Sequence, residues 1–386
     1  MEKYFIAAIS AANQIGSKTF QQLLNFFGTA EKIWLATPED FQNCGLKKNA
    51  TDSFFQFRAE HPNAPEKLQN YCAVKKINLC SFVDEDYPPI LKEISLPPAI
   101  FYYRGILEPF AERIAMVGTR HCTPYGKNVA TKISEELAKA GITVVSGAAV
   151  GIDTFSHQGA MKFGRTVAVL GCGINFRESF DKQKFLDEIV ENGGLVLSEF
   201  EPTMQPQKGT FPTRNRIIAG LSRGVIVVEA GQKSGALLTA NFAADFSRDV
   251  FAVPGNIFSE KSDGCHNLIH DGGNLITSAK DVLNFYNFTS EKNLFVDSEN
   301  LSDKKVSDKN ISEEKKSAKK ILTSPPVTLD EIEKKVLNLI PFDENITVDE
   351  ILLQADELEP NEISEILLKL EVKKVIQEND ATYIRI

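Results

Sequence analysis

The stretch ITVVSGAAVGID, residues 142–153, decides the fold. Its apolar run Ile142–Val145 ends in a cluster of small residues, and a helix-like segment follows. The same unit recurs in residues 112–285, where the other apolar runs are Ile114–Val117, Val167–Leu170, Leu195–Leu197, Val225–Val228 and Val250–Val253. Short apolar runs that alternate with helical segments are typical of parallel strands joined by helices. The sequence therefore predicts an α/β protein with an extended Rossmann-type, doubly wound sheet.

The composition of the chain changes on either side of this region. These changes predict that the chain has four parts. They are an N-terminal helical domain of helix-hairpin-helix or SAM-like type at 1–71, the Rossmann domain at 72–285, a disordered linker at 286–326 and a winged-helix domain at 327–386. Apolar residues recur at helical spacing in the first part, at Phe20, Leu23, Leu24 and Phe27. The linker is rich in Ser, Asn, Asp, Lys and Glu, which bury little surface. The last part recovers helical periodicity and ends in a strand-like segment.

Two tight turns in the N-terminal part, Gln14–Ser17 and Asn43–Leu46, contain the glycine of a helix-hairpin-helix turn. Such turns can present backbone amides to DNA phosphates. They also occur in small helical modules that only pack. Both interpretations remain open at the level of sequence.

The net charge of −9 is unevenly distributed. Residues 328–386 contain 15 acidic and 6 basic residues, whereas residues 112–285 contain 18 of each. An anionic ligand responds to the local field at its site and not to the total charge, so the acidity does not exclude nucleic acid. Within the predicted winged helix, Glu362 and Glu365 outnumber Lys369, which favours a protein contact over DNA for that domain.

The remaining bulk features indicate a cytoplasmic protein. No run of 18 apolar residues occurs, so no membrane span is expected, and the N-terminus lacks the pattern of a signal peptide. The six cysteines are scattered and include no C-x-x-C pair. This pattern favours a reducing compartment and argues against a disulfide framework or a zinc site.

Glycine-rich loops and cations follow the predicted strands. In an open α/β sheet, ligands bind beyond the carboxyl ends of the strands, where glycines and helix N-termini present amides to an anion. The segment from Lys208 to Arg216 is predicted to be a long loop on this edge. The residues predicted to bind phosphate are Gly118, Thr119, Arg120, Ser146, Gly147, Gly171, Gly173, Lys208, Phe211, Arg214, Asn215, Arg216, Lys233, Ser234 and Gly235. Their convergence predicts a cationic, amide-lined groove.

Known nucleotide and catalytic patterns do not fit. Phe176 stands where the third glycine of a dinucleotide site would follow Gly171-x-Gly173, and Gly126-Lys127-Asn128 lacks the Walker A spacing. Asp153 is expected to cap or orient a helix start. No nucleophile–base pair is evident, so we expect no catalytic residue, no metal and no cofactor.

Phe211 lies between Lys208 and Arg214 in a polar segment. Bases of single strands stack on exposed aromatic rings, whereas a duplex hides its base faces. Phe211 is therefore either a stacking residue for single-stranded DNA or an anchor in the core.

These motifs resemble those of DprA (Smf), the DNA-processing protein A family. The matching segments are Gly118-Thr119-Arg120, Ser146-Gly147 with Gly151-Ile152-Asp153, Val169–Gly173, Phe211–Leu221, Val227–Ala230, Ser234-Gly235 with Thr239-Ala240, and Phe251–Gly255. The resemblance is dense over 72–285 and weaker in the flanking parts. Two positions depart from the family: Val150 stands at a usual arginine, and Asn175-Phe176-Arg177 replaces a Tyr-Pro-containing turn.

The resemblance implies a homodimer that protects incoming single-stranded DNA and loads the RecA recombinase in natural transformation and recombination, without catalysis. Arg120 would hold phosphate, and Lys208, Phe211, Arg214 and Arg216 would line the same groove.

Two other functions compete with this one. A nucleoside-monophosphate hydrolase of a related Rossmann variant would carry Pro-Gly-Gly-x-Gly-Thr and a catalytic glutamate, but the corresponding strand end, Glu229–Gly235, lacks that motif. A small-nucleotide sensor would use the same groove. A test of binding to oligo-dT, together with incubation with AMP, distinguishes these three functions.

Overall fold

The computed structural model describes residues 1–176, 179–288, 330–340, 346–355, 358, 360–373, 375–379 and 382–385. Arg177 and the predicted linker, apart from residues 286–288, lie outside the described residues. The chain forms two compact units. The first contains nearly all of the described residues up to 288, and the second contains those from 330 onward.

A nine-stranded sheet organises the first unit, in the order β1-β2-β6-β5-β4-β3-β7-β8-β9. The strands are β1 (Asn78–Ser81), β2 (Ile100–Gly105), β3 (Arg113–Val117), β4 (Thr143–Ser146), β5 (Thr166–Val169), β6 (Leu195–Ser198), β7 (Gly224–Val227), β8 (Asp249–Ala252) and β9 (Asn274–Leu275). The seven strands from β6 to β9 in this order are parallel, and β2 pairs antiparallel with both β6 and β1. The predicted parallel-dominated sheet is confirmed.

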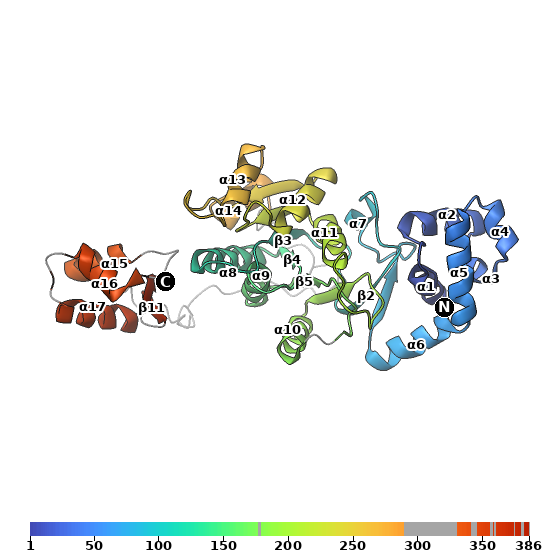
Figure 1. The fold of residues 1–386 in the computed structure, drawn as a ribbon, viewed down its shortest axis with the longest axis horizontal. Helices are drawn as coiled ribbons and strands as arrows, with labels where there is room; N and C mark the ends of the chain where they lie inside the picture. Colours follow the sequence, from blue (N-terminus) through green and yellow to red (C-terminus); the bar gives the residue numbers. More distant parts are fainter. Residues whose placement is uncertain are drawn as a thin grey trace, which may run out of the picture. The chain divides into compact units, whose positions relative to one another are not determined.

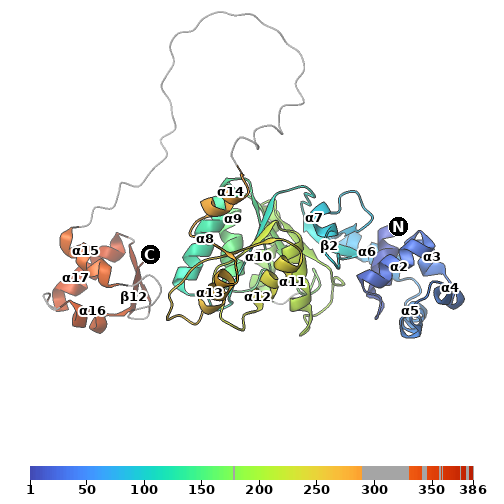
Figure 2. The same cartoon turned by 90° about the horizontal axis from the view of Figure 1, so that it is seen from above.

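Helices cover both faces of this sheet. They are α8 (Pro124–Lys139), α9 (Ile152–Met161), α10 (Phe180–Glu191), α11 (Thr210–Gly220), α12 (Gly235–Asp245), α13 (Asp263–His270) and α14 (Ala279–Phe285). Crossovers between parallel strands are right-handed, so a reversal of strand order moves the helices to the other face. Accordingly α8, α9 and α10 lie on one face, and α11, α12 and α13 lie on the other (Figures 1 and 2). Strands buried on both faces are typically apolar runs, as β7 is throughout and β3 is after Arg113.

The N-terminal helices pack at the β1–β2 end of the sheet (Figure 1). They are α1 (Glu2–Ala11), α2 (Ser17–Phe27), α3 (Ala30–Leu35), α4 (Pro38–Asn43), α5 (Lys48–Glu60) and α6 (Ala64–Lys75), and the short α7 (Pro89–Lys92) lies between β1 and β2. Helix α1 contacts both β1 and β2, and Lys3 Nζ donates to the Leu79 carbonyl oxygen at 3.3 Å. The helices therefore share a continuous apolar core with this end of the sheet.

The second unit has its own apolar core and combines helices with a small antiparallel sheet. Its elements are α15 (Glu331–Leu339), β10 (Ile346–Thr347), α16 (Val348–Gln354), α17 (Pro360–Val372), β11 (Ile376–Asn379) and β12 (Thr382–Arg385). On α17, Lys369 forms an ion pair with Glu365 at 2.8 Å. Nowhere in the described parts of the chain is a helix both long enough and apolar enough to cross a bilayer.

The strand order reverses at β3, which has β4 on one side and β7 on the other. Such a reversal opens a crevice beyond the carboxyl ends of the strands, because the connections leave in opposite directions. The loops after β3, β4, β5 and β7 are those that the sequence places in the candidate site.

Stability is expected to fall at acidic pH through His157 on α9. This side chain is fully buried, its Nδ1 lies 2.6 Å from Thr166 Oγ1, and burial lowers its pKa to about 3. An unfolded histidine titrates near 6.5, so between about pH 6.5 and 3 the unfolded state binds a proton that the folded state does not. This group alone should lower the free energy of unfolding by about 2 kcal/mol between pH 6.5 and 5.

Urea unfolding at several pH values checks this expectation. His157→Leu should flatten the pH dependence over that interval, whereas His270→Leu, at an exposed histidine, should leave it unchanged. Equal slopes in the wild type and His157→Leu would contradict the assignment.

Candidate nucleic-acid interface

Backbone hydrogen bonds join the loops around β3. The Thr119 amide donates to the Glu229 carbonyl oxygen at the end of β7, at 2.7 Å. The Ile152 amide, at the start of α9, donates to the Thr119 carbonyl oxygen at 3.2 Å. Gly118 permits this approach, since a Cβ there would overlap the Ile152 side chain. The loops after β3, β4 and β7 therefore form one connected surface.

Asp153 fixes the loop after β4. Its Oδ2 accepts hydrogen bonds from the amides of Gly147 at 3.1 Å and Ala149 at 3.3 Å. Burial raises the pKa of this carboxyl, and the Arg214 guanidinium opposes the rise. The Ser146 hydroxyl donates to the Met116 carbonyl oxygen at 2.6 Å. Ser146 and Gly147 thus use these polar groups within the fold, which does not support the prediction that they bind phosphate.

Arg214 is buried beneath the surface and does not line it. Its side chain is 4% exposed, and Nη1 donates to the carbonyl oxygens of Gly147, at 2.8 Å, and Val169. Burial lowers its pKa to about 10, so the guanidinium remains charged at neutral pH. Arg214 therefore joins the ends of β4 and β5, and the predicted groove-lining role is corrected.

Arg216 is also turned away from the predicted groove. It is 8% exposed, and Nη2 binds both carboxylate oxygens of Glu199, at 2.5 and 2.6 Å. Glu199 follows β6, so this ion pair joins α11 to the chain after that strand. The groove-lining role of Arg216 is corrected for the same reason. Its partner could not be identified from sequence, because no local spacing relates positions 199 and 216.

Phe211 lies between two of the loops. A Cβ on Gly171 would approach Phe211 Cδ1 to 2.7 Å, so the ring occupies the space that this glycine leaves open. The Arg120 guanidinium carbon lies 5.5 Å from the ring centroid. The ring is half-buried, and Arg120 is exposed. Phe211 therefore supports Arg120, and stacking of a base on Phe211 stays a prediction.

Gly173 serves the internal packing of the loop after β5. Its amide donates to the Met204 carbonyl oxygen at 2.8 Å, and a Cβ there would overlap the backbone of Glu201 and Pro202. Because its amide is engaged, its predicted contact with phosphate is not supported.

The N-termini of α11 and α12 complete the surface. Ser234 caps α12 by accepting a hydrogen bond from the Ala236 amide at 3.3 Å. Asn215 Nδ2 donates to the Gly235 carbonyl oxygen at 3.3 Å, and its Oδ1 accepts from Arg214 Nε at 3.2 Å. Asn215, midway along α11, thus ties this helix to the start of α12. Both helices begin on the carboxyl edge, where their N-terminal dipoles favour an anion.

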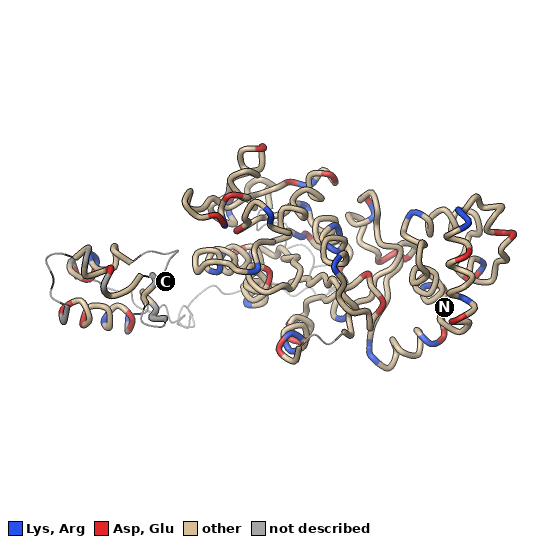
Figure 3. The backbone as a smooth tube through the Cα atoms, in the orientation of Figure 1, with Lys and Arg blue, Asp and Glu red and all other residues tan. Residues whose placement is uncertain are grey.

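Three predicted cations remain exposed: Arg120, Lys208 and Lys233. None of the ion pairs found among the described residues includes them. Lysine and arginine positions elsewhere in the first unit are interspersed with acidic ones (Figure 3). The carboxyl edge therefore combines three exposed cations with the N-termini of α11 and α12.

Two other candidate features lie at the β1–β2 end of the sheet. A cavity of about 690 Å³ lies between the N-terminal helices and the sheet, bordered by Tyr71, Tyr102 and Met204. It contains none of the predicted site residues. Cys80, Asp84 and Asp86 form a cluster of metal-ligand types, but burial raises the pKa of the Cys80 thiol, and its Sγ lies 3.5 Å from Asp86 Oδ1. A neutral thiol is a poor metal ligand.

Gly151 should be the glycine least tolerant of substitution in these loops. Its φ of 90° and ψ of −136° are accessible essentially to glycine alone, and a Cβ would clash with the carbonyl oxygens of Thr119 and Arg120. We expect Gly151→Ala to lower the free energy of unfolding by about 1–3 kcal/mol in urea titrations. Gly209→Ala is the control, because a Cβ there meets nothing within 4 Å. Equal stability of the two variants would contradict the expectation.

Residues 78–287 match the family model described as DNA recombination-mediator protein A. The chain belongs to this DprA family. Among DprA relatives, the Streptococcus pneumoniae DNA processing protein DprA is 44% identical over 277 residues, covering 70% of this chain and 94% of that protein. The Bacillus subtilis DprA is 38% identical over 257 residues, covering 66% and 84%.

Solved DprA structures agree with the fold. The X-ray structure of the S. pneumoniae protein superposes with a TM-score of 0.63 at 35% identity, covering 74% of this chain and 98% of that chain. A Helicobacter pylori DNA processing protein A structure, described for its single-stranded-DNA binding mode, gives a TM-score of 0.50 at 30% identity, covering 55% and 95%. The first unit is therefore a DprA-type fold.

Proposed function

We propose that this chain binds single-stranded DNA along the carboxyl edge of its sheet and acts in DNA processing during natural transformation and recombination. The observation that carries the proposal is the group of exposed cations, Arg120, Lys208 and Lys233, on the edge where α11 and α12 begin. Cations and helix N-termini together favour a polyanion. The single-stranded-DNA binding described for the H. pylori relative supports the choice of ligand.

The finer parts of the proposal rest on family membership. We infer that the protein protects incoming strands, loads RecA and forms a homodimer in the cytoplasm. The N-terminal helices would be a helix-hairpin-helix or SAM-like domain, and the second unit would be a winged helix used for a protein contact. The ion pair of Lys369 with Glu365 supports a protein contact for the second unit. The pair neutralises a positive charge that binding to DNA phosphates would require.

No observation favours the hydrolase alternative. Glu229, at the end of β7, is 3% exposed and lies against Gly126, where a Cβ would overlap its carboxylate. Glu199 is engaged by Arg216. These two strand-end glutamates are therefore poorly placed to act on a bound nucleotide, which supports a role as a binding protein.

Three parallel measurements test the proposal: fluorescence anisotropy with dye-labelled oligo-dT, the same with a duplex, and incubation with AMP followed by chromatography. We expect binding to oligo-dT that weakens with salt, weaker binding to duplex and no conversion of AMP. Free oligo-dT at modest ionic strength would reject the proposal, and release of adenine would favour the hydrolase.

A further inference from the structure

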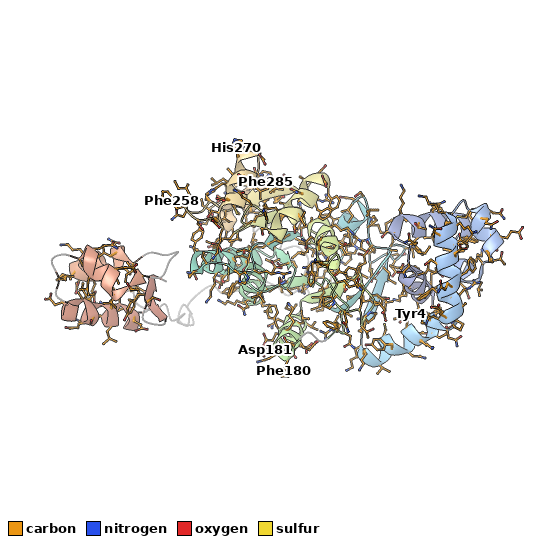
Figure 4. The ribbon with its side chains drawn as sticks, in the orientation of Figure 1. Tyr4, Phe180, Asp181, Phe258, His270 and Phe285 are labelled. Atoms are coloured by element: carbon orange, nitrogen blue, oxygen red, sulfur yellow. The ribbon has the colours of Figure 1, made fainter. Side chains whose placement is uncertain are left out.

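One aromatic side chain on the carboxyl edge has no role in the fold. Phe258 follows β8 and is 89% exposed, more than any other large apolar side chain in the described part of the chain. Ile257 beside it is 76% exposed. Figure 4 shows Phe258 projecting outward from the margin of the first unit.

Hydrogen bonds between neighbouring residues hold the turn that presents Phe258. The Phe258 amide donates to Asn256 Oδ1 at 2.9 Å, and the Ser259 amide donates to the Asn256 carbonyl oxygen at 3.1 Å. His266 Nε2 lies 3.1 Å from the Gly255 carbonyl oxygen. The ring therefore projects from an ordered turn. It should lose little additional conformational entropy when it binds a flat ligand.

This turn is joined to the loop that carries Lys233. The Ala230 amide donates to the Lys261 carbonyl oxygen at 2.8 Å, and Gln232 Nε2 donates to Asp263 Oδ2 at 3.2 Å. The loop that carries Lys233 also contacts the loop after β3, because the Thr119 amide donates to the Glu229 carbonyl oxygen at 2.7 Å. Phe258 thus stands one strand beyond β7 on the edge that displays Arg120 and Lys233.

We propose that Phe258 is a stacking platform for a base of the bound single strand, so that the strand runs past Arg120 and Lys233 to the end of β8. The inference rests on the proposed function and extends its site. Aromatic rings stack any base while neighbouring cations hold the backbone. Phe258 itself carries no charge, so its contribution would come from contact with the base and not from attraction to phosphate.

Anisotropy with dye-labelled oligo-dT and an abasic oligonucleotide of equal length tests the proposal on the full chain. Phe258→Ala should weaken oligo-dT binding roughly tenfold without changing the salt slope. Phe258→Trp should restore affinity, and the abasic strand should not distinguish Phe258→Ala from the wild type. Phe110→Ala is the matched control: Phe110 is 78% exposed but lies between β2 and β3, at the opposite edge of the parallel strands.

The outcomes separate the two proposals. If the wild type leaves oligo-dT free, the proposed function fails. If the wild type binds and Phe258→Ala binds equally well, only the stacking platform is rejected. If Phe258→Ala loses the same affinity for the abasic strand, its effect does not depend on a base and the inference is overturned. A changed elution in size-exclusion chromatography would mean that Phe258 contacts a second copy of the chain, which also overturns it.

Discussion

Replacing Arg216 with methionine is expected to lower the free energy of unfolding by about 3 kcal/mol, because it leaves Glu199 without its partner in a largely buried site. The Arg216 and Glu199 side chains are 9% and 18% exposed, so water cannot fully replace the lost guanidinium. Urea unfolding of the purified variant measures the effect. Binding to oligo-dT under conditions where the variant is folded should retain the wild-type salt slope.

A double-mutant cycle separates this structural role from a DNA contact. Arg216→Met combined with Glu199→Leu removes both charges, and its stability should return to within about 1 kcal/mol of the wild type. If Arg216 instead held a phosphate, Arg216→Met would reduce the salt slope by about 0.7 and leave the stability nearly unchanged. That pattern would mean that Arg216 lines the groove after all.

The sequence predicts the parallel sheet because its signals are local. Each observed strand from β3 to β8 begins and ends within one residue of a predicted apolar run, and the loops after them are the glycine-rich segments. Parallel strands share one carboxyl edge, so the order of strands and loops is enough to place the exposed cations Arg120, Lys208 and Lys233 on that edge.

The roles of Arg214 and Arg216 could not be predicted in this way. The sequence predicts a loop from Lys208 to Arg216, but α11 already begins at Thr210. Residues two apart on a helix point about 200° away from each other. Arg214 therefore faces the ends of β4 and β5, and Arg216 faces Glu199. From sequence alone, a buried arginine in this segment looks the same as an exposed one. The two can be told apart only when the residue at which the helix begins is known.

The exposure of Phe258 is likewise invisible in the sequence, where an aromatic residue after a strand is more often part of the core. Phe211 stands out because polar residues surround it, yet the space left by Gly171 receives its ring. The signal that could have found Phe258 is its place in the turn after Pro254-Gly255, on the same edge as the cations.

The combined variant Arg120→Ala, Lys208→Ala and Lys233→Ala should lose single-stranded-DNA affinity by on the order of 100-fold near 50 mM salt. Each phosphate contact with a single strand contributes about 0.7 to the slope of log K against log salt, so three lost contacts should reduce the slope by about 2. Anisotropy titrations at several salt concentrations measure both quantities. Stability should change little, because all three side chains are exposed and make no ion pair among the described residues.

A variant with the same change in net charge at the opposite edge of the sheet is the matched control. Lys139 ends α8, Lys162 follows α9 and Arg223 precedes β7, so all three lie near the amino ends of the parallel strands. Their surface pairs with other side chains contribute little to stability. Replacing these three residues with alanine should leave the salt slope close to that of the wild type. An equal reduction in both variants would mean that net charge governs affinity and that the carboxyl edge does not hold the strand.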